Sequence, residues 1–410
     1  MAAKPKARRQ YGTGSITQRK DGTWLGRVDA GYTPSGNRRV KSVVRKTEAE
    51  AKSALRAVIR KIEAGEAGLN ARTTVKQWCD EWLPMQEKRV RPKAFTADKG
   101  AVNNWIVPNI GARKLADLTP ADVRKVQDAV SAKRKQGTAI RVHTTLMGAL
   151  KAASQEGHNV PGRVLQAPPP RPDATQNDRT DVSVTEAVQM LKAAEDMPDR
   201  SRWVAALLQG MRQGERNGLA WDHVDLDAGT LDVSWQLQPL PYKHGCGTPC
   251  GKKPSKCPSH TFRVPVGYES RRVFGAWHLV RPKTSSGQRV MPLVPWMVDS
   301  LRQWREVCPD SILVWPRPDG KPRTDKMDLA DWHALQDRAG VRHPSGRYYH
   351  THEARHTTAT LLMALGVDTQ VIIAIMGHAS ILSTRQYQHA DLTLMRAALD
   401  GVAERLQLTP

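Results

Sequence analysis

The chain has 410 residues, and its 63 Lys and Arg residues outnumber its 40 Asp and Glu residues to give a formal net charge of +23. This length allows two or three domains with their own cores, and the positive excess favours a polyanionic partner, usually nucleic acid. No apolar run approaches the roughly 18 residues of a membrane-spanning helix, and the N-terminus has no apolar signal sequence. We therefore expect a cytoplasmic protein that acts without a membrane.

The first 72 residues are the most basic part, with 17 Lys and Arg against 6 Asp and Glu. Their pattern predicts short strands with turns at residues 20–22 and 34–36, then a helix that begins at Thr47 and ends at Gly65. We expect residues 1–72 to form a three-stranded sheet packed on one helix, which suits an arm that lays a strand face into a DNA groove. The alternative is a solvated, partly disordered basic arm.

Residues 73–160 predict a small all-helical domain, because apolar residues recur every three or four positions and Thr119-Pro120 marks a helix start. Its basic residues suit contacts with a DNA duplex, and a solvated surface explains each of them equally well. They are Lys88, Arg89, Arg91, Lys93, Lys133, Arg134, Lys135 and Arg141.

Residues 161–180 are rich in proline and polar side chains, which predicts a linker, and we place the domain boundary near residue 175. Residues 181–410 form the last domain. Within it, Arg212 follows a glycine at the end of an apolar helix, and Glu215 opens the next helix. An arginine in so apolar a setting needs an acidic partner or an anionic ligand.

Two patterns further on predict strands. Residues 231–238 alternate apolar and polar side chains. Residues 277–293 indicate two strands joined by a turn at 284–287, which would place Lys283 at the tip of a β-hairpin.

The stretch from His352 to Tyr387 gathers chemically active residues. His352 and Arg355 are three positions apart, a spacing that brings side chains onto one helical face. Two apolar helical runs follow, and Gly377 ends the second just before His378. Tyr387 lies nine residues beyond His378, so the two converge only if the chain bends between them.

In their order and setting, four pieces closely resemble the catalytic domain of tyrosine recombinases, the integrases of phages and integrative elements. They are MRQGE with Arg212, Lys283, HEARHT with His352 and Arg355, and GH followed by Tyr387. Two details depart from the family pattern: Ala354 stands where Leu is common, and Gln209 and Asn217 are unusual neighbours of the first piece.

The resemblance implies a mainly α multidomain fold with small β-sheets. Its parts are an arm-type DNA-binding domain with a three-stranded sheet plus helix, a helical core-binding domain, and an α+β tyrosine-recombinase catalytic domain. The resemblance also implies the partners of the chain. They are double-stranded DNA with core and arm attachment sites, further copies of the chain in a homotetramer on DNA, and a directionality factor or DNA-bending host protein. Residues 391–410 would dock on a neighbouring subunit, which suggests half-of-sites firing; packing on their own domain is the alternative.

Metal-free cleavage of a phosphodiester needs a nucleophile, positive charge on the non-bridging oxygens and an acid for the leaving oxygen. Tyr387 suits the first role, and Arg212 with Arg355 suits the second. In this scheme Lys283 protonates the departing 5′ oxygen. Of the remaining groups, His352 accepts the tyrosine proton, His378 donates to the phosphate, and Glu215 orients Arg212 or a histidine. No cofactor is required. Tyr348 and Tyr349 are the other candidate tyrosines here, and we expect both to pack at the start of the HEARHT helix.

The implied function is site-specific recombination through a 3′-phosphotyrosyl intermediate, integrating and excising a mobile element. The alternatives are a Xer-like resolvase, a type IB topoisomerase and a DNA-binding regulator without catalysis. The separate basic arm domain argues against the first two, and the complete set of reacting groups argues against the third.

A basic insertion, residues 240–276, carries seven Lys and Arg residues and one acid. Five cysteines, an odd number, argue against a disulfide framework, and three of them lie here. The spacing C-x3-C-x6-C-x2-H supplies four zinc ligands: Cys246, Cys250, Cys257 and His260. A zinc site and a flexible basic insertion that touches DNA both remain open.

Overall fold

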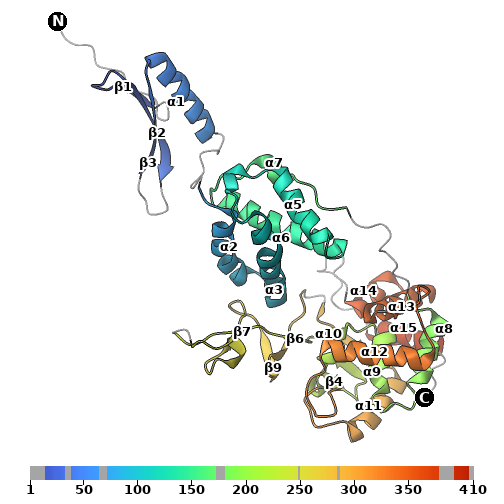
Figure 1. The fold of residues 1–410 in the computed structure, drawn as a ribbon. Coiled ribbons are helices and arrows are strands. Elements are labelled where there is room, and N and C mark those ends of the chain that lie inside the picture. Colours follow the sequence, from blue (N-terminus) through green and yellow to red (C-terminus); the bar gives the residue numbers. More distant parts are fainter. Residues whose placement is uncertain are drawn as a thin grey trace. The chain divides into compact units, whose positions relative to one another are not determined.

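The computed structural model describes residues 14–32, 38–63, 72–171, 181–247, 250–283, 287–377 and 392–405. Internal contacts divide the chain into two compact units, residues 1–174 and 175–410 (Figure 1). The expected fold class, mainly helical and multidomain with small antiparallel sheets, is confirmed. Within the described residues, no helix is long and apolar enough to cross a bilayer.

The N-terminal sheet is confirmed. Its order is β1 (Ser15–Gln18), β2 (Trp24–Tyr32) and β3 (Arg38–Arg45), all antiparallel, and α1 (Glu48–Glu63) packs against it. The first turn closes because Gly22 adopts a φ of 83° and the Thr23 N–H donates to the Asp21 carboxylate at 2.9 Å. Thr47 caps α1, since its hydroxyl oxygen accepts from the Glu50 N–H at 3.3 Å.

The helical region is also confirmed. It consists of α2 (Val75–Arg89), α3 (Pro92–Ala101), a π-helical turn (Val102–Ile106), α4 (Val107–Ile110), α5 (Pro120–Ser131) and α6 (Gln136–Gln155). Thr119 starts α5 as expected, because its hydroxyl and backbone N–H both donate to the Asp122 carboxylate. The core is closed around Trp78, Ile106 and Leu118, which are at most 2% exposed.

The first part of the predicted linker, residues 161–171, is structured. Residues 162–165 form α7 (Gly162–Leu165), and Val164 is fully buried in the helical core. Gln127 and Gln136 also donate to the carbonyls of Pro168 and Arg171 at 2.9 and 3.0 Å. Residues 161–171 therefore belong to the helical region, because their few apolar side chains pack into its core.

The second unit has eight helices among its described residues and two three-stranded antiparallel sheets. The helices are α8 (Val184–Ala193), α9 (Arg200–Leu207), α10 (Gln213–Asn217), α11 (Pro295–Val307), α12 (Asp325–Ala339), α13 (Thr351–Ala364), α14 (Thr369–Met376) and α15 (Leu392–Arg405). One sheet has the order β6 (Gln236–Pro239), β10 (Trp277–Val280), β9 (Ser270–Phe274). The other has the order β11 (Val290–Pro292), β5 (Thr230–Asp232), β4 (Val224–Asp225).

Two strand predictions in this unit were wrong in detail. The expected single strand over 231–238 is split into the end of β5 and the start of β6, which belong to different sheets. The expected hairpin over 277–293 does not form either, because β10 pairs with β6 and β9 whereas β11 pairs with β5. Lys283 therefore lies on the connection between two sheets, not at a hairpin tip.

The C-terminal helix α15 packs on its own domain. Leu399 and Val402 are fully buried, and Arg396 donates to the carbonyls of Leu293 and Gly229 at 2.9 and 3.1 Å. For residues 392–405 the single chain therefore shows the alternative, packing on its own domain, and docking on a neighbouring subunit stays a prediction.

Candidate active site

Arg212 stands at the N-terminus of α10, immediately after the turn at Gly210. Its Nη1 donates to Glu215 Oε1 at 2.6 Å, and its Nη2 donates to the Gly377 carbonyl at 3.0 Å. The side chain remains 35% exposed. The sequence predicted that this arginine needs an acidic partner or an anion, and the structure supplies Glu215 while leaving part of the guanidinium accessible.

Arg355, on α13, is buried, with only 1% of its surface exposed. Its two Nη groups donate to the carbonyls of Gly210 and Met376, so it joins the turn before Arg212 to the end of α14. The close approach requires glycine at 210, where φ is 57° and an added Cβ would lie 2.9 Å from Met376 Sδ. Burial lowers the pKa of Arg355 to about 9, and the charges of Arg212 and Arg289 act in the same direction.

Glu215 is shared between two arginines. It is 2% exposed, and its Oε2 accepts from Arg289 Nη2 at 3.0 Å, while Arg289 Nε donates to the Ile375 carbonyl at 2.8 Å. Burial alone would raise the pKa of Glu215, but the charges and hydrogen bonds of Arg289 and Arg212 hold it below its usual value. Two guanidinium groups thus share one carboxylate and a third, Arg355, lies near enough to feel their charges, so the net positive charge favours an anionic ligand.

Arg289 is a site residue that the sequence did not identify. It is 6% exposed and comes just before β11, in the apolar run RVMPL. The argument applied to Arg212, that an arginine among apolar residues needs an anionic partner, holds for Arg289 as well and could have found it.

The other predicted site residues are placed differently or lie outside the described part of the chain. His352 is exposed on the first turn of α13, with its ring 4.8 Å from that of His356, whereas Arg355 on the same helix is buried. Lys283 is exposed. His378 and Tyr387 lie outside the described residues, although Gly377, which immediately precedes His378, is held by Arg212.

The end of α14 occurs where the sequence predicted it. Asp368 caps α14, since its carboxylate accepts from the Gln370 N–H at 2.8 Å, and Gly377 terminates it with a φ of 57°. This left-handed residue turns the Met376 and Gly377 carbonyls toward Arg355 and Arg212. The carbonyls of Met376 and Gly377, which come just before His378 in the sequence, are therefore bonded to two arginines of the site.

Tyr348 and Tyr349 contact α12 and α8 through their side chains. The Tyr349 hydroxyl donates to the Glu186 carboxylate at 3.1 Å, and burial together with Glu186 raises the pKa of Tyr349 to about 12. The Tyr348 ring stacks on His333 at 4.0 Å, and its hydroxyl donates to Asp337 at 3.0 Å. Both hydroxyls are therefore engaged with carboxylates of the scaffold.

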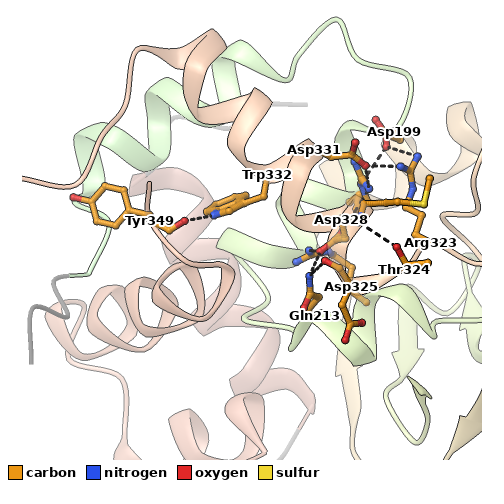
Figure 2. Close-up of polar contacts among 12 residues, drawn as sticks. Asp199, Gln213, Arg323, Thr324, Asp325, Asp328, Asp331, Trp332 and Tyr349 are labelled. Carbon is orange, nitrogen blue, oxygen red and sulfur yellow. Dashed lines mark hydrogen bonds and ion pairs between the residues drawn. The ribbon is translucent and has the colours of Figure 1, made fainter. Parts of the chain in front are cut away.

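A buried ion-pair network holds α10, and with it Arg212, against α12. Asp328 Oδ2 accepts from Arg216 Nη2 at 2.6 Å and from Gln213 Nε2 at 2.8 Å, so both ends of α10 are tied to one carboxylate. Arg202, Arg323, Asp199 and Asp331 complete the network, part of which Figure 2 shows around the start of α12. Three arginines are thus matched by three aspartates.

The same close-up shows a second link to the site. Trp332, fully buried on α12, donates from Nε1 to the Tyr349 carbonyl at 2.7 Å (Figure 2). The chain then enters α13, whose Glu353 accepts from Arg347 at 2.7 Å and from the His350 N–H at 2.7 Å. These contacts fix the start of the helix that carries His352 and Arg355.

Glu215→Gln should make the second unit less stable at neutral pH and less sensitive to acid. A carboxylate with a lowered pKa contributes stability above its unfolded pKa of about 4.3, and this contribution is lost as the pH falls through the folded pKa. We expect a loss of about 3 kcal/mol at pH 7 for the amide, because two arginines lose their buried partner. The difference in stability between variant and wild type should shrink below about pH 4.

Urea unfolding as a function of pH measures this difference, with the exposed Glu404→Gln as control. An equal gap at all pH values would contradict it.

Comparison with known proteins identifies the architecture. Residues 270–393 match the phage integrase family, and residues 74–131 match the SAM-like N-terminal domain of phage integrases. An integrase of Saccharopolyspora erythraea is 28% identical, with 98% of this chain and 97% of that protein covered.

The Tn1549 transposon integrase, solved with transposon right-end DNA, is similar in structure, with a TM-score of 0.60 at 17% identity, covering 81% of this chain and 100% of that one. A lambda integrase tetramer solved on a Holliday junction gives a TM-score of 0.52 at 16% identity, covering 90% and 97%. The ordered motifs and the fold agree with these matches: the chain carries a phage integrase family region and a phage integrase SAM-like region, and its relatives are integrases and tyrosine recombinases.

Proposed function

We propose that this chain is a site-specific DNA recombinase that cuts and rejoins strands through a 3′-phosphotyrosyl intermediate to integrate and excise a mobile element. The observation that carries the proposal is the arginine cluster. Arg212 and Arg289 share the Glu215 carboxylate, and Arg355 bonds to the Met376 carbonyl at the end of α14. Such a cluster is preorganised to hold a phosphodiester anion.

The two predicted arginines have different parts in this scheme. Arg212 is 35% exposed, so its guanidinium can meet a non-bridging oxygen directly. Arg355 is buried and bonds to the backbone carbonyls of Gly210 and Met376. Its Nε has no acceptor among the described residues. Arg289 and Glu215 position Arg212, since they are buried and bonded to one another.

The reaction conserves the energy of the bond it breaks. The Tyr387 oxygen attacks phosphorus, its proton passes to His352, and the departing 5′ oxygen takes a proton from Lys283 while His378 donates to the phosphate. Because the tyrosyl phosphodiester replaces the DNA phosphodiester, a second 5′-hydroxyl can attack it and release Tyr387. Catalysis needs no cofactor.

We assign DNA contacts by part of the chain. The basic sheet of residues 14–63 suits arm-type sites, and the helical region of residues 72–171 suits core-type sites. The Tn1549 and lambda structures contain DNA, and one of the lambda structures is a tetramer on a Holliday junction. We propose that this chain likewise assembles as a homotetramer on double-stranded DNA in the bacterial cytoplasm, together with a directionality factor or DNA-bending host protein.

The direct experiment uses purified protein and labelled DNA from the junctions flanking its gene. We expect a protease-sensitive covalent adduct and products with exchanged partners. Relaxation of plasmid that lacks these junctions would favour a type IB topoisomerase instead. Binding without any adduct would indicate a regulator without catalysis.

Arg212→Ala should slow strand cleavage by about 10²–10³-fold, because one preorganised donor to the transition-state phosphate is removed. Affinity for the duplex should change little, since most phosphate contacts lie elsewhere on the protein. Single-turnover cleavage of a nicked suicide substrate separates the two effects. Arg338→Ala serves as control, because this arginine pairs with Asp196 on the surface. A cleavage rate for Arg212→Ala equal to that of the control would remove Arg212 from the site.

A further inference from the structure

The basic insertion has no apolar core of its own. Among the described residues between Pro241 and Gly275, Cys257 is the only one with a buried side chain. The segment forms a short ribbon in which β7 (Tyr242–Lys243) pairs with β8 (Thr261–Phe262), and Figure 1 shows this ribbon beside β6 and β9. A stretch of this length needs another source of stability to keep one conformation.

One histidine and three cysteines meet at the end of this ribbon. His244 Nδ1 lies 3.5 Å from Cys250 Sγ and 3.7 Å from Cys246 Sγ, and Cys246 Sγ lies 3.5 Å from Cys257 Sγ. All four ligand atoms fall within 4.8 Å of one another. The three cysteines are free thiols, and the sulfur separation is far longer than the roughly 2.05 Å of a disulfide.

These distances match the edges of a tetrahedral zinc site. With Zn–S bonds of about 2.3 Å and a Zn–N bond of about 2.0 Å, a tetrahedron has S–S edges of about 3.8 Å and S–N edges of about 3.5 Å. The side chains therefore already stand at ligand spacing, and only small adjustments would bring them onto one ion.

The backbone around the four residues is shaped to hold them together. A Cβ at Gly245 would clash with the Ser259 carbonyl, so only glycine lets the chain between His244 and Cys246 pass so close to the opposite arm of the ribbon. A 3-10 turn, Pro254–Lys256, leads into Cys257, whose N–H donates to the Pro254 carbonyl at 3.2 Å. A close backbone approach and a tight turn thus present the ligands.

His260 is not part of this group, which corrects the ligand set expected from spacing. Its Nδ1 lies 3.0 Å from the Cys257 carbonyl oxygen, and its ring packs edge-on against Tyr242 at 5.1 Å. Phe262 extends this aromatic group to His278 on β10 at 4.3 Å, which anchors the ribbon to the domain. His244 stands on the opposite arm of the ribbon and takes the fourth ligand position, because β7 and β8 pair antiparallel.

We propose that His244, Cys246, Cys250 and Cys257 bind one structural zinc ion, which supplies the core that the insertion lacks. Four protein ligands close the coordination shell, so the ion has no open position for catalysis. Three thiolates around Zn²⁺ leave one negative charge, which the exposed side chains of Lys243, Lys252, Lys253 and Lys256 offset. The ion would hold these lysines as a fixed basic surface. This inference does not depend on the recombinase reaction.

Metal analysis of the full-length chain, purified without chelator, tests the proposal. We expect about one zinc per chain in the wild type, and a loss of most of it in His244→Asn and in Cys250→Ser. The matched controls His260→Asn and Cys308→Ser should keep the ion. Replacement by cobalt should give the visible bands and thiolate charge-transfer absorption of a tetrahedral site in the wild type but not in Cys250→Ser.

Limited proteolysis provides a second measurement that does not depend on metal content after purification. Chelation should expose residues 240–276 to cleavage while the rest of the second unit stays intact, and zinc should restore protection. The zinc site would be overturned if the wild-type chain held far less than one zinc. It would also be overturned if proteolysis of residues 240–276 were the same with and without chelator. Zinc retained in His244→Asn but lost in His260→Asn would overturn the ligand set.

Discussion

Tyr387→Phe is expected to abolish the covalent protein–DNA adduct and strand exchange while leaving DNA binding unchanged. The substitution removes only the phenolic oxygen, which the proposed reaction uses as nucleophile, so we expect a loss of about 10⁴-fold or more. Tyr348 and Tyr349, the two other tyrosines close to the predicted motifs in sequence, are engaged elsewhere. The hydroxyls of Tyr348 and Tyr349 are bonded to Asp337 and Glu186, and the pKa of Tyr349 is raised to about 12.

The assay is denaturing electrophoresis of labelled junction DNA, with binding followed separately by gel shift. Tyr348→Phe is the matched control, since it deletes one phenol oxygen near the start of α13 without touching the arginine cluster. Adduct formed by Tyr387→Phe would refute the assignment, and peptide mapping of that adduct would show which residue carries the DNA.

Asp328→Ala is expected to destabilise the second unit by about 3–5 kcal/mol, because a fully buried charge loses its partners. Arg216 is 0% exposed, and burial lowers its pKa, an effect that Asp328 opposes. Without Asp328, this guanidinium and Gln213 on the same helix lose the carboxylate that holds them. Urea unfolding followed by tryptophan fluorescence measures the change.

A surface ion pair provides the contrast. Asp319→Ala removes pairs with Arg317 at 2.7 Å and Lys321 at 3.2 Å, all at least partly exposed to solvent, and should cost at most about 1 kcal/mol. The double change Arg216→Met with Asp328→Leu should recover much of the stability, because apolar residues of similar volume tolerate burial. If Asp328→Ala cost no more than the surface control, the network would not be what holds α10 and Arg212 in place.

Local signals determined much of this protein before any tertiary contact was known. Turn chemistry at residues 20–22 and the cap at Thr47 predicted the N-terminal sheet and helix, and Thr119-Pro120 and Gly377 marked helix ends correctly. Such signals succeed because a cap or a left-handed glycine acts on backbone groups within four residues. The order of the chemical motifs likewise predicted the family.

Contacts between distant residues required the tertiary structure. Arg289 meets Glu215 across 74 residues and Arg212 meets Gly377 across 165, so neither pairing has a local signature. Strand partners were equally hidden: alternation predicted strands near 231–238 and 277–293, but a strand's partner depends on which edges the fold brings together. For the same reason the fourth ligand atom of the cysteine cluster belongs to His244 and not to His260. Sequence spacing counts residues along the chain, whereas a metal site depends on which side chains the paired strands bring together.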